Sequence, residues 1–470
     1  MAKKTTFGVV VGTRGFFPTH LAVQGRTEML RILKEQGFDT VCLGPREAQG
    51  GAIESLADAR LCAELLKKNA DRIDGVLVTL PNFGDERAVA NTLRASGLQV
   101  PVLVHAWPDD AKKMTVENRR DSFCGKMSVC NNLDQYGIRF SLTDLHCVDP
   151  TTKSFKADLA RFGAACRVVR GLKGARVGAI GARTGPFNTV RYSEKILEAA
   201  GISVETIDLS EVLGRASALK SGDPAVRRKL QAFKAYTDTS GVTETSLDRM
   251  ARFAVVIDRW MKDQGLIGTA LQCWTALEEF YGIVPCAVMS MMSENLLPSA
   301  CEVDITGLVG MLALRFATET PAALVDWNNN YGADPDKCVL FHCSNLPKSL
   351  FATQKMAVQE IIAGSVGAEN ACGSIVGRLK AGAFTYARVD TDDSSGDIRS
   401  YVGEGRLTDD PLETFGGFGV CQIPNLQGLL RRICADGFEH HVAIAMGQVG
   451  RALEDAFGNY LGWDVYRHEA

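Results

Sequence analysis

The first third of the chain alternates short apolar runs with segments whose apolar residues recur every three or four positions. Short runs rich in β-branched residues are typical of buried parallel strands, and the three-to-four spacing is typical of amphipathic helices. The predicted strands are 7–12, 39–44, 75–80 and 100–106, and the predicted helices are 21–36, 53–69 and 86–96. This order predicts an α/β domain with a parallel sheet over residues 1–150, with function in the loops at the strand ends.

A polar segment that begins at Asp149 leads into a helix, and GARVGAIGARTG then opens a second alternating unit. We therefore predict a second α/β domain over residues 151–317. Gly174, Gly178 and Gly181 are not spaced as GxGxxG, and no acidic residue follows a second strand in the way that a dinucleotide site requires. The pattern favours a tight strand-to-helix turn over a nucleotide site.

The last part of the chain, 318–470, has short apolar runs separated by turns rich in Gly, Asn and Asp, and a final helical segment at 448–459. This pattern predicts a β-rich domain. The segment DTDDSSGDIRSYVGEG is too polar for a core, so we interpret it as a hairpin whose acidic run is solvated rather than a calcium loop.

Composition narrows the class of partner. Of 470 residues 46% are hydrophobic, and 52 Lys and Arg against 55 Asp and Glu give a net charge of -3, without the basic field that nucleic acid or an anionic membrane would need. We predict a small-molecule partner. The apolar start is interrupted by Gly12, Thr13 and Arg14, and even the run 308–316 is broken by Arg315, so we expect no signal peptide, no membrane span and a cytoplasmic protein. The 14 cysteines form no CxxC pair, which favours reduced thiols over disulfides or a zinc ribbon.

Three residues at the ends of apolar segments are candidates for chemistry. Glu302 precedes the run 303–316, where an acidic side chain can also simply stabilise a helix N-terminus. Asp326 ends another apolar run, where a carboxylate can also begin an Asx-turn. His440 and His441 are adjacent, and because neighbouring strand residues point to opposite faces, at most one of them is expected to reach a given site.

Together, two carboxylates and an imidazole form a hard coordination set made mostly of oxygen. Such a set prefers Mn²⁺, Mg²⁺ or Co²⁺ to zinc. Carboxylates that share a cation can also move a proton between adjacent carbons of a sugar while the metal chelates its carbonyl and hydroxyl oxygens.

The segment ACEVDITGLVGMLALRFATETPAALVDWNNNYG resembles the metal-binding segment of the L-fucose and L-arabinose isomerase superfamily, and more closely its fucose-type branch. The 24-residue separation of Glu302 and Asp326 matches, which implies that both are metal ligands and acid/base residues. EHHVAIAMGQVG resembles the family's glycine-flanked histidine segment and implies His441, not His440, as the third ligand. CVLFHCSN resembles the arabinose-type strand that supplies a further histidine, so His342 is either a fourth ligand or, as we favour, a residue behind the ligands.

The resemblance also implies two Rossmann-like α/β domains with parallel sheets followed by a β-rich, barrel-like C-terminal domain, assembled as a trimer or hexamer with shared active sites. Arg14 is then a candidate for reaching into a neighbouring subunit's site, or it caps its own loop. LQCWTALEEFYGIVP resembles a pocket-lining stretch, which makes Gln272 and Trp274 candidate sugar contacts. Trp327 is a further candidate, with a plain core position as the alternative.

The resulting prediction is a metal-dependent aldose–ketose isomerase that uses Mn²⁺, or Mg²⁺ or Co²⁺. The metal would hold O1 and O2 of the open-chain sugar while the carboxylates transfer a proton through an enediol; a hydride shift is the alternative. A neutral deoxy-aldose and an anionic sulfo- or phospho-aldose are both candidate substrates, because Arg14, Arg183 and Lys173 lie at loop positions that suit an anionic terminus and a backbone carbonyl equally well. A catalytically silent sugar-binding relative and an oxidoreductase with a nucleotide at Gly178 to Gly185 are the other hypotheses.

Overall fold

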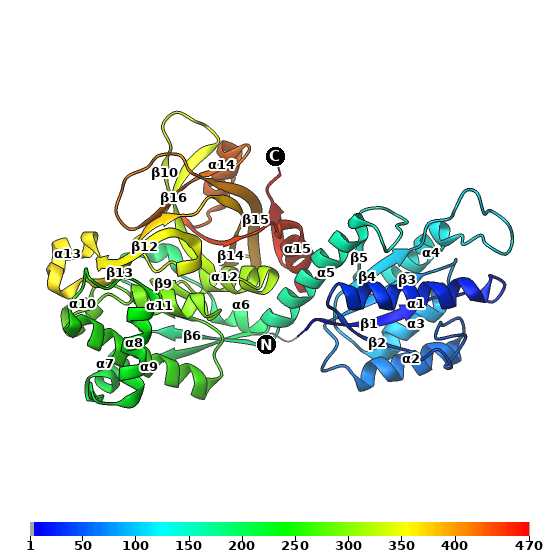
Figure 1. Cartoon of the computed structure of the whole chain (residues 1–470), viewed down its shortest axis with the longest axis horizontal. Coiled ribbons are helices and arrows are strands. Elements are labelled where there is room, and N and C mark those ends of the chain that lie inside the picture. Colours follow the sequence, from blue (N-terminus) through cyan, green and yellow to red (C-terminus); the bar gives the residue numbers. More distant parts are fainter. Residues whose placement is uncertain (1–3, 470) are drawn as a thin grey trace. The chain divides into compact units, whose positions relative to one another are not determined.

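The structure of the protein, a computed structural model, describes residues 4–469 (Figure 1). The chain forms two compact units. Unit 1 is the chain up to Arg170 together with Asp455–Gly462, and unit 2 is Gly171–Glu454 together with the residues from Trp463 onward. No helix in the described part of the chain is long and apolar enough to cross a membrane.

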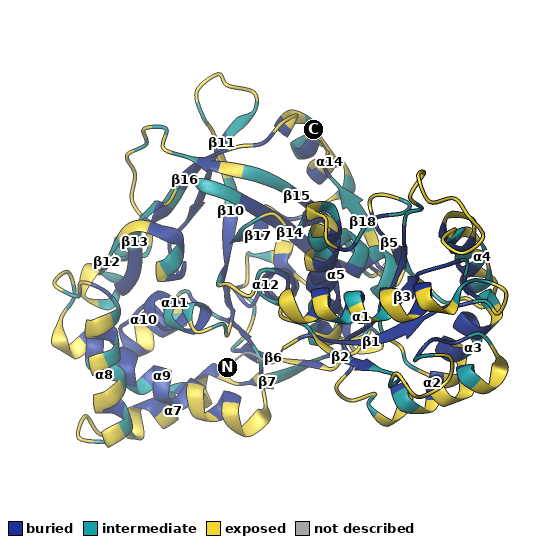
Figure 2. Ribbon diagram, turned by 45° about the vertical axis from the view of Figure 1, so that its right-hand side comes forward, coloured by how far each residue is buried: buried dark blue, intermediate teal, exposed yellow. Residues whose placement is uncertain are grey.

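Unit 1 is built on a parallel five-stranded sheet of order β2-β1-β3-β4-β5. The strands are β1 (Thr6–Val11), β2 (Asp39–Cys42), β3 (Gly75–Leu80), β4 (Val102–Ala106) and β5 (Ser141–Leu142). The helices are α1 (Thr19–Glu35), α2 (Leu56–Lys68), α3 (Glu86–Ser96), α4 (Ser122–Gln135), most of α5 (Lys153–Leu172) and the π-helical segment η4 (Asp455–Leu461). All residues of β1, β3 and β4 are buried, which explains their almost unbroken apolar sequences (Figure 2).

Unit 2 begins with a second parallel sheet, of order β7-β6-β8-β9. Its strands are β6 (Ala175–Ile180), β7 (Ile202–Ile207), β8 (Thr269–Leu271) and β9 (Ser299–Cys301). Its helices are η1 (Asn188–Val190), α6 (Glu194–Ala199), α7 (Leu209–Ala218), α8 (Pro224–Tyr236), α9 (Glu244–Gln264), α10 (Ala276–Tyr281), α11 (Cys286–Glu294) and α12 (Ile305–Thr318). Helix α12 is buried from Ile305 to Leu314, as the mostly apolar sequence of this stretch predicts.

The rest of unit 2 is a closed barrel of antiparallel strands in the order β16-β11-β10-β17-β14-β15, closed by pairing of β15 with β16. Strands β12, β13 and β18 extend the same sheet. The strands are β10 (Ala322–Asn330), β11 (Lys337–His342), β12 (Phe351–Val358), β13 (Cys372–Leu379), β14 (Gly382–Asp392), β15 (Asp397–Thr408), β16 (Gly417–Gln422), β17 (His441–Met446) and β18 (Asp464–Arg467). The connecting helices are η2 (Lys348–Leu350), α13 (Glu360–Val366), η3 (Ala368–Asn370), α14 (Leu426–Asp436) and α15 (Gly450–Glu454).

The predicted fold class is confirmed: two α/β parts with parallel sheets precede an antiparallel barrel. The predicted hairpin in the polar segment is also present, because β14 and β15 pair on both sides of the turn 393–396. The division into domains 1–150, 151–317 and 318–470 stays a prediction, since the compact units group the second sheet with the barrel.

Candidate metal-binding active site

The three candidate ligands come together at the junction of the second parallel sheet and the barrel. Glu302 directly follows β9 at the carboxyl end of the parallel sheet, Asp326 lies in β10, and His441 is the first residue of β17. Strands β10 and β17 are antiparallel neighbours in which Asp326 is the register partner of His441. Barrel pairing therefore brings together side chains that are far apart in sequence, and the β9–α12 connection brings Glu302 to them.

Glu302 lies in a tight turn, not in the helix. Glu302 and Val303 both have left-handed backbone conformations, with φ of 55° and 59°, which is unusual for residues other than glycine. Helix α12 begins only at Ile305, and its N-cap is Asp304, whose side chain accepts a 2.7 Å hydrogen bond from the Gly307 backbone N–H. The sequence interpretation that placed Glu302 in the first turn of the helix is therefore wrong, and the capping role belongs to Asp304.

The carboxylates of Glu302 and Asp326 each direct one oxygen at His441. His441 Nε2 lies 3.5 Å from Glu302 Oε2 and 3.5 Å from Asp326 Oδ1. Among the described residues neither of these buried oxygens has a hydrogen-bond partner. Since a buried carboxylate oxygen without a partner is costly, the arrangement needs a positive group between these atoms. Ligand atoms bound about 2.0–2.2 Å from one cation lie roughly 3.0–3.5 Å apart, so the observed spacing fits a divalent ion.

The two fully buried imidazoles at this site, His342 and His441, respond to the same negative field. His342 Nε2 lies 4.0 Å from Glu302 Oε2. Burial alone would lower the pKa of His342, but Cys343 and the carboxylates of Asp326 and Glu302 outweigh burial and raise it to about 10. The pKa of His441 is also raised despite burial, by its hydrogen bond to Asp304 and by the nearby carboxylates. The site thus carries excess negative charge, which a cation would neutralise.

His440 also approaches Asp326, contrary to the expectation that at most one of the adjacent histidines reaches the site. Its Nε2 lies 3.8 Å from Asp326 Oδ1, and its ring centroid lies 4.7 Å from that of His441. The strict alternation of a strand does not apply, because β17 begins at His441 and His440 precedes it. The two histidines still differ in burial, with side-chain exposures of 44% for His440 and 1% for His441.

Two cysteines, Cys273 and Cys301, lie beside the Glu302 carboxylate and form with it a softer candidate ligand set. Ligand atoms of Cys273, Cys301 and Glu302 lie within 4.8 Å of one another. Burial raises the pKa of Cys273 to about 12, and a hydrogen bond with Cys273 together with burial raises that of Cys301, so both thiols are neutral near pH 7. Because the thiolate is the form that binds metal, the oxygen-rich set is favoured over the cysteines.

Two family models match the chain. Residues 8–173 match the N-terminal domain of fucose/sulfoquinovose isomerase, and residues 340–469 match the C-terminal domain of L-fucose isomerase, together well over half of the sequence. The chain belongs to the fucose isomerase family. It is an aldose–ketose isomerase, as the sequence predicts. Glu302 and Asp326 lie between the two matched segments, so the match itself does not include these carboxylates.

Three relatives share this similarity over different portions of the chain. The sulfoquinovose isomerase of Priestia megaterium is 23% identical over 458 residues, which cover 96% of this chain and 97% of that protein. The sulfoquinovose isomerase of Alkalicoccus urumqiensis is 24% identical over 320 residues, which cover 66% of this chain and 69% of the relative. That of Clostridium sp. is 27% identical over 198 residues, 41% of this chain and 43% of the relative.

Aromatic side chains line the candidate metal site of this fucose isomerase family member. Trp274 Nε1 donates a 3.1 Å hydrogen bond to Glu302 Oε1, the oxygen that does not face His441. The ring of Phe187 lies 5.5 Å from the rings of both His440 and His441 and 6.1 Å from that of Trp274. Sequence reasoning missed Phe187, which lies in the irregular loop after β6, where no periodicity marks it.

The remaining predicted substrate contacts lie in other environments. Trp327 Nε1 donates a 2.9 Å hydrogen bond to Tyr401 Oη and packs against the barrel core, which agrees with the alternative of a core position. Gln272 Oε1 accepts a 3.0 Å hydrogen bond from the Ala182 backbone N–H and lines a separate cavity of about 720 Å³ at the carboxyl edge of the parallel sheet. Neither side chain makes a described contact with the candidate ligands.

Arg14 lies in unit 1, in the loop after β1. Its guanidinium stacks on Phe83 with 4.2 Å between Cζ and the ring centroid, donates a 3.0 Å hydrogen bond to the Gly84 carbonyl and forms an ion pair with Glu86. It therefore ties its loop to the β3–α3 loop of the same unit, rather than capping its own loop.

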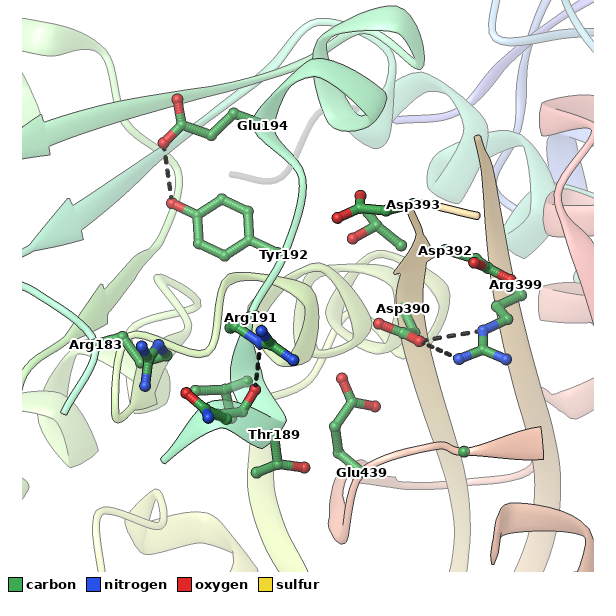
Figure 3. Close-up of a pocket in the computed structure, with 14 residues that line it drawn as sticks. Arg183, Thr189, Arg191, Tyr192, Glu194, Asp390, Asp392, Asp393, Arg399 and Glu439 are labelled. Atoms are coloured by element: carbon green, nitrogen blue, oxygen red, sulfur yellow. Dashed lines mark hydrogen bonds and ion pairs between the residues drawn. The ribbon is translucent and has the colours of Figure 1, made fainter. Parts of the chain in front are cut away.

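A polar cavity of about 630 Å³ adjoins the chain segment that carries the candidate histidines (Figure 3). Its wall includes Arg183 and Arg191 from the loop after β6, and Glu439, which precedes His440. Arg183 donates to the Thr184 and Gly185 carbonyls and Arg191 to the Asn188 carbonyl, and in the described part of the chain neither forms an ion pair with a carboxylate.

The glycine-rich turn after β6 does not have dinucleotide-site geometry. An acidic residue does follow the second strand, contrary to the sequence interpretation: Asp208 comes directly after β7. Its Oδ1 accepts a 2.7 Å hydrogen bond from the Ser210 backbone N–H and so caps α7. Helix α6 begins only at Glu194, so the turn at Gly181 does not open a helix whose N-terminus faces it.

Proposed function

We propose that this chain is a divalent-cation-dependent isomerase of an anionic sulfo-sugar of the sulfoquinovose type. The main support is a pair of buried carboxylate oxygens, Glu302 Oε2 and Asp326 Oδ1. Each lies 3.5 Å from His441 Nε2, and neither has a hydrogen-bond partner among the described residues. The similarity to sulfoquinovose isomerases supports a 6-sulfo-sugar over a neutral deoxy-aldose.

Glu302, Asp326 and His441 would hold the cation. A hard, oxygen-rich set favours Mn²⁺, with Mg²⁺ and Co²⁺ as alternatives. Bound there, the cation would polarise the oxygens on C1 and C2 of the open-chain sugar and make the C2 proton more acidic. His342, which is buried and faces Glu302 at 4.0 Å, is proposed as a residue behind the ligands.

The proposed chemistry is proton transfer through an enediol. One carboxylate removes the proton from C2, the C2–H electron pair forms the C1=C2 bond, and the carbonyl electron pair goes to O1, which takes up a proton to give the enediol. Loss of the O2 proton, with return of a proton to C1, then gives the ketose. Asp326 is the more accessible of the two carboxylates, with a side-chain exposure of 20% against 8% for Glu302. Trp274 orients the carboxylate of Glu302 by its hydrogen bond and, with Phe187, offers an aromatic wall to the sugar carbons. A hydride shift is the alternative route.

The sulfonate needs a cation that is not already neutralised. Arg183 meets this requirement because its guanidinium donates only to backbone carbonyls of its own loop and lines the polar cavity. Phe187, in the same loop, contacts the rings of the candidate metal site. A guanidinium matches the geometry of a sulfonate through paired hydrogen bonds. We therefore propose Arg183 as the principal sulfonate contact, with Arg191 beside it.

Several predictions from the sequence stay open. Gln272 and Trp327 as sugar contacts, Arg14 as a contact with a neighbouring subunit's site, assembly as a trimer or hexamer, and a cytoplasmic location are all hypotheses for this chain.

The test is an isomerisation assay with metal-stripped protein. Sulfoquinovose, glucose 6-phosphate, glucose and 6-deoxyglucose are incubated with Mn²⁺, Mg²⁺ or Co²⁺, and ketose formation is followed by NMR. We expect turnover of the sulfo-sugar that depends on the cation and is abolished by EDTA. In deuterated water, deuterium at C1 of the ketose supports the enediol route. Turnover without any divalent ion, or preference for a neutral aldose, would refute the corresponding part of the proposal.

A further inference from the structure

Four ionisable residues form a buried network behind the candidate metal site, with Glu439 at its edge in the wall of the polar cavity. Arg388 and Asp304 are 0% exposed, His441 is 1% exposed and Glu439 is 5% exposed. They come from four separate segments: β14, the N-cap of α12, the first position of β17 and the loop before it. The burial of so many charges is rare in proteins unless each is paired, so their contacts are informative.

The contacts form a continuous chain that starts at His441. His441 Nδ1 lies 2.9 Å from Asp304 Oδ2. Arg388 donates hydrogen bonds to Asp304 from both terminal nitrogens, 2.6 Å from Nη1 to Oδ2 and 3.1 Å from Nη2 to Oδ1. Its Nη2 also donates to Thr306 Oγ1 at 2.9 Å. On its other side Arg388 donates to Glu439, at 2.9 Å from Nε and 2.6 Å from Nη2. Every donor of Arg388 named here has an acceptor.

The two ring nitrogens of His441 therefore have different surroundings. Nδ1 faces Asp304, a carboxylate already held by Arg388, whereas Nε2 faces the unpartnered oxygens of Glu302 and Asp326 at 3.5 Å each. Both oxygens of Asp304 accept hydrogen bonds from the Arg388 guanidinium, and Oδ1 also accepts one from the Gly307 backbone N–H, so this carboxylate offers His441 Nδ1 only an acceptor. The proton of a neutral His441 ring therefore lies on Nδ1, and the Nε2 lone pair points toward the candidate ligands.

Gly307 in α12 leaves the space that the Asp304–Arg388 ion pair occupies. A Cβ on Gly307 would lie 2.4 Å from Asp304 Oδ2 and 2.8 Å from Arg388 Nη1. Glycine within a helix is otherwise unfavourable. Its presence in the first turn of α12 is explained if the Asp304–Arg388 pair must stay in place. A helix cap alone does not need this pair, because Ser, Thr or Asn would cap equally well without a buried charge.

We propose that Asp304 is a positioning residue that holds His441 in its Nδ1–H form with Nε2 free to bind a divalent cation, and that Arg388, anchored by Glu439, fixes Asp304. This inference rests on the proposed cation site. It assigns roles to three buried residues that do not themselves face the unpartnered oxygens.

The first test compares Mn²⁺ affinity, measured by electron paramagnetic resonance of free Mn²⁺. Asp304→Asn retains the shape and capping ability of the side chain and should weaken Mn²⁺ binding by about 10–100-fold, the effect typical of losing such a carboxylate partner. The matched control is Asp223→Asn, because Asp223 caps α8 in the same unit by an equivalent 2.7 Å hydrogen bond and faces no histidine. The control should leave Mn²⁺ affinity unchanged.

A second variant removes no functional group. Gly307→Ala should displace the Asp304 carboxylate and weaken Mn²⁺ binding. Gly214→Ala, in α7, is the matched control and should not weaken binding, because a Cβ added there would meet no atom within 4 Å. This pair keeps the inference testable if Asp304→Asn does not fold. If Asp304 had only a structural role, its loss would lower stability without changing the tautomer of His441. The second readout is therefore ¹⁵N NMR of histidine-labelled protein with Mg²⁺. We expect the His441 ring to be protonated at Nδ1.

The outcomes separate the two proposals. Failure of the wild-type chain to bind any divalent ion would overturn the proposed cation site, and this inference with it. Mn²⁺ binding by the wild type that neither Asp304→Asn nor Gly307→Ala weakens, or a His441 ring protonated at Nε2, would overturn the positioning role alone.

Discussion

The two parallel sheets of the chain treat polar residues at their carboxyl edges in opposite ways. In unit 1 the buried His105 is fully partnered: Nδ1 lies 2.9 Å from Thr79 Oγ1, and Nε2 lies 2.8 Å from the Val148 carbonyl. Trp107 Nε1 donates to the same Thr79 hydroxyl at 3.1 Å. In unit 2, by contrast, Oε2 of Glu302 at the carboxyl edge and Oδ1 of Asp326 on the adjoining barrel strand β10 have no hydrogen-bond partner among the described residues.

The pKa values of the buried histidines in the two regions differ accordingly. Burial lowers the pKa of His105 to about 3, so this imidazole is neutral and serves as a hydrogen-bonding core residue. His342 is just as buried, yet the surrounding anions raise its pKa to about 10. A buried polar residue at a strand end is therefore not sufficient to indicate a site. The informative feature is an electrostatic demand that the protein does not satisfy by itself.

The largest expected effect comes from removing the negative charge of the Glu302 carboxylate. Glu302→Gln should lower kcat by about 10³-fold or more, because it removes a ligand and an acid/base group together. It should weaken Mn²⁺ binding while leaving metal-free stability unchanged or higher, since an uncompensated buried charge is lost. Steady-state kinetics, Mn²⁺ titration and urea unfolding measure the three quantities.

Thr79→Val is the matched change in unit 1. It leaves both His105 and Trp107 without their shared partner and should lower the free energy of unfolding by about 1–3 kcal/mol, with Mn²⁺ affinity unchanged. If Glu302→Gln instead destabilised the metal-free protein as Thr79→Val does, the contrast between a satisfied and an unsatisfied region would be lost.

A third unpartnered carboxylate sharpens the comparison. Glu278 is 0% exposed and neither of its oxygens has a hydrogen-bond partner among the described residues. Burial raises its pKa to about 8, so near pH 7 the carboxyl group of Glu278 is protonated and needs no neighbouring cation. The folded state thus binds a proton that the unfolded state, with a pKa near 4.5, has released, and this group's contribution to stability is lost as the pH rises from about 4.5 to 8.

Glu278→Gln should therefore be more stable than the wild type by about 2–4 kcal/mol at pH 8.5, and nearly equal to it at pH 4.5. Urea unfolding followed across this range gives both values. Glu279→Gln, a change in the exposed neighbouring residue, is the control and should show no such pH-dependent gain. A constant difference between Glu278→Gln and the wild type across the range would contradict a buried, protonated Glu278.

The smallest expected effect concerns specificity. Arg183→Gln should raise KM for sulfoquinovose by about 10–100-fold, the loss of one charge-assisted contact, and leave KM for a neutral aldose and Mn²⁺ affinity nearly unchanged. Arg176→Gln is a suitable control, because Arg176 pairs with Glu205 on neighbouring strands and does not line the cavity. Equal losses on neutral and anionic sugars would place Arg183 outside the sulfonate contact.

Much of the architecture was predictable from hydrophobic periodicity. The alternation in the first third predicts strands β1 to β4 and helices α1 to α3 of unit 1 to within a few residues, since a strand buried on both faces needs an unbroken apolar run. Helix α4 and the short strand β5 were not predicted. For the site, the network behind His441 was missed although it left two signals. Asp304 stands where an N-cap is expected before an apolar helix, and Arg388 is a charge within the apolar run FTYARV.

The sequence by itself determined the order of elements, the family and the residue types available for a hard metal site, because these depend on local periodicity and on motif spacing. Only the tertiary structure decided how those residues act. The turn that directs Glu302 away from the helix, the barrel register that pairs Asp326 with His441, and the burial that leaves two oxygens without partners all arise from contacts between distant segments. Electrostatic demand depends on burial and on distances across the fold, and neither can be read along the chain.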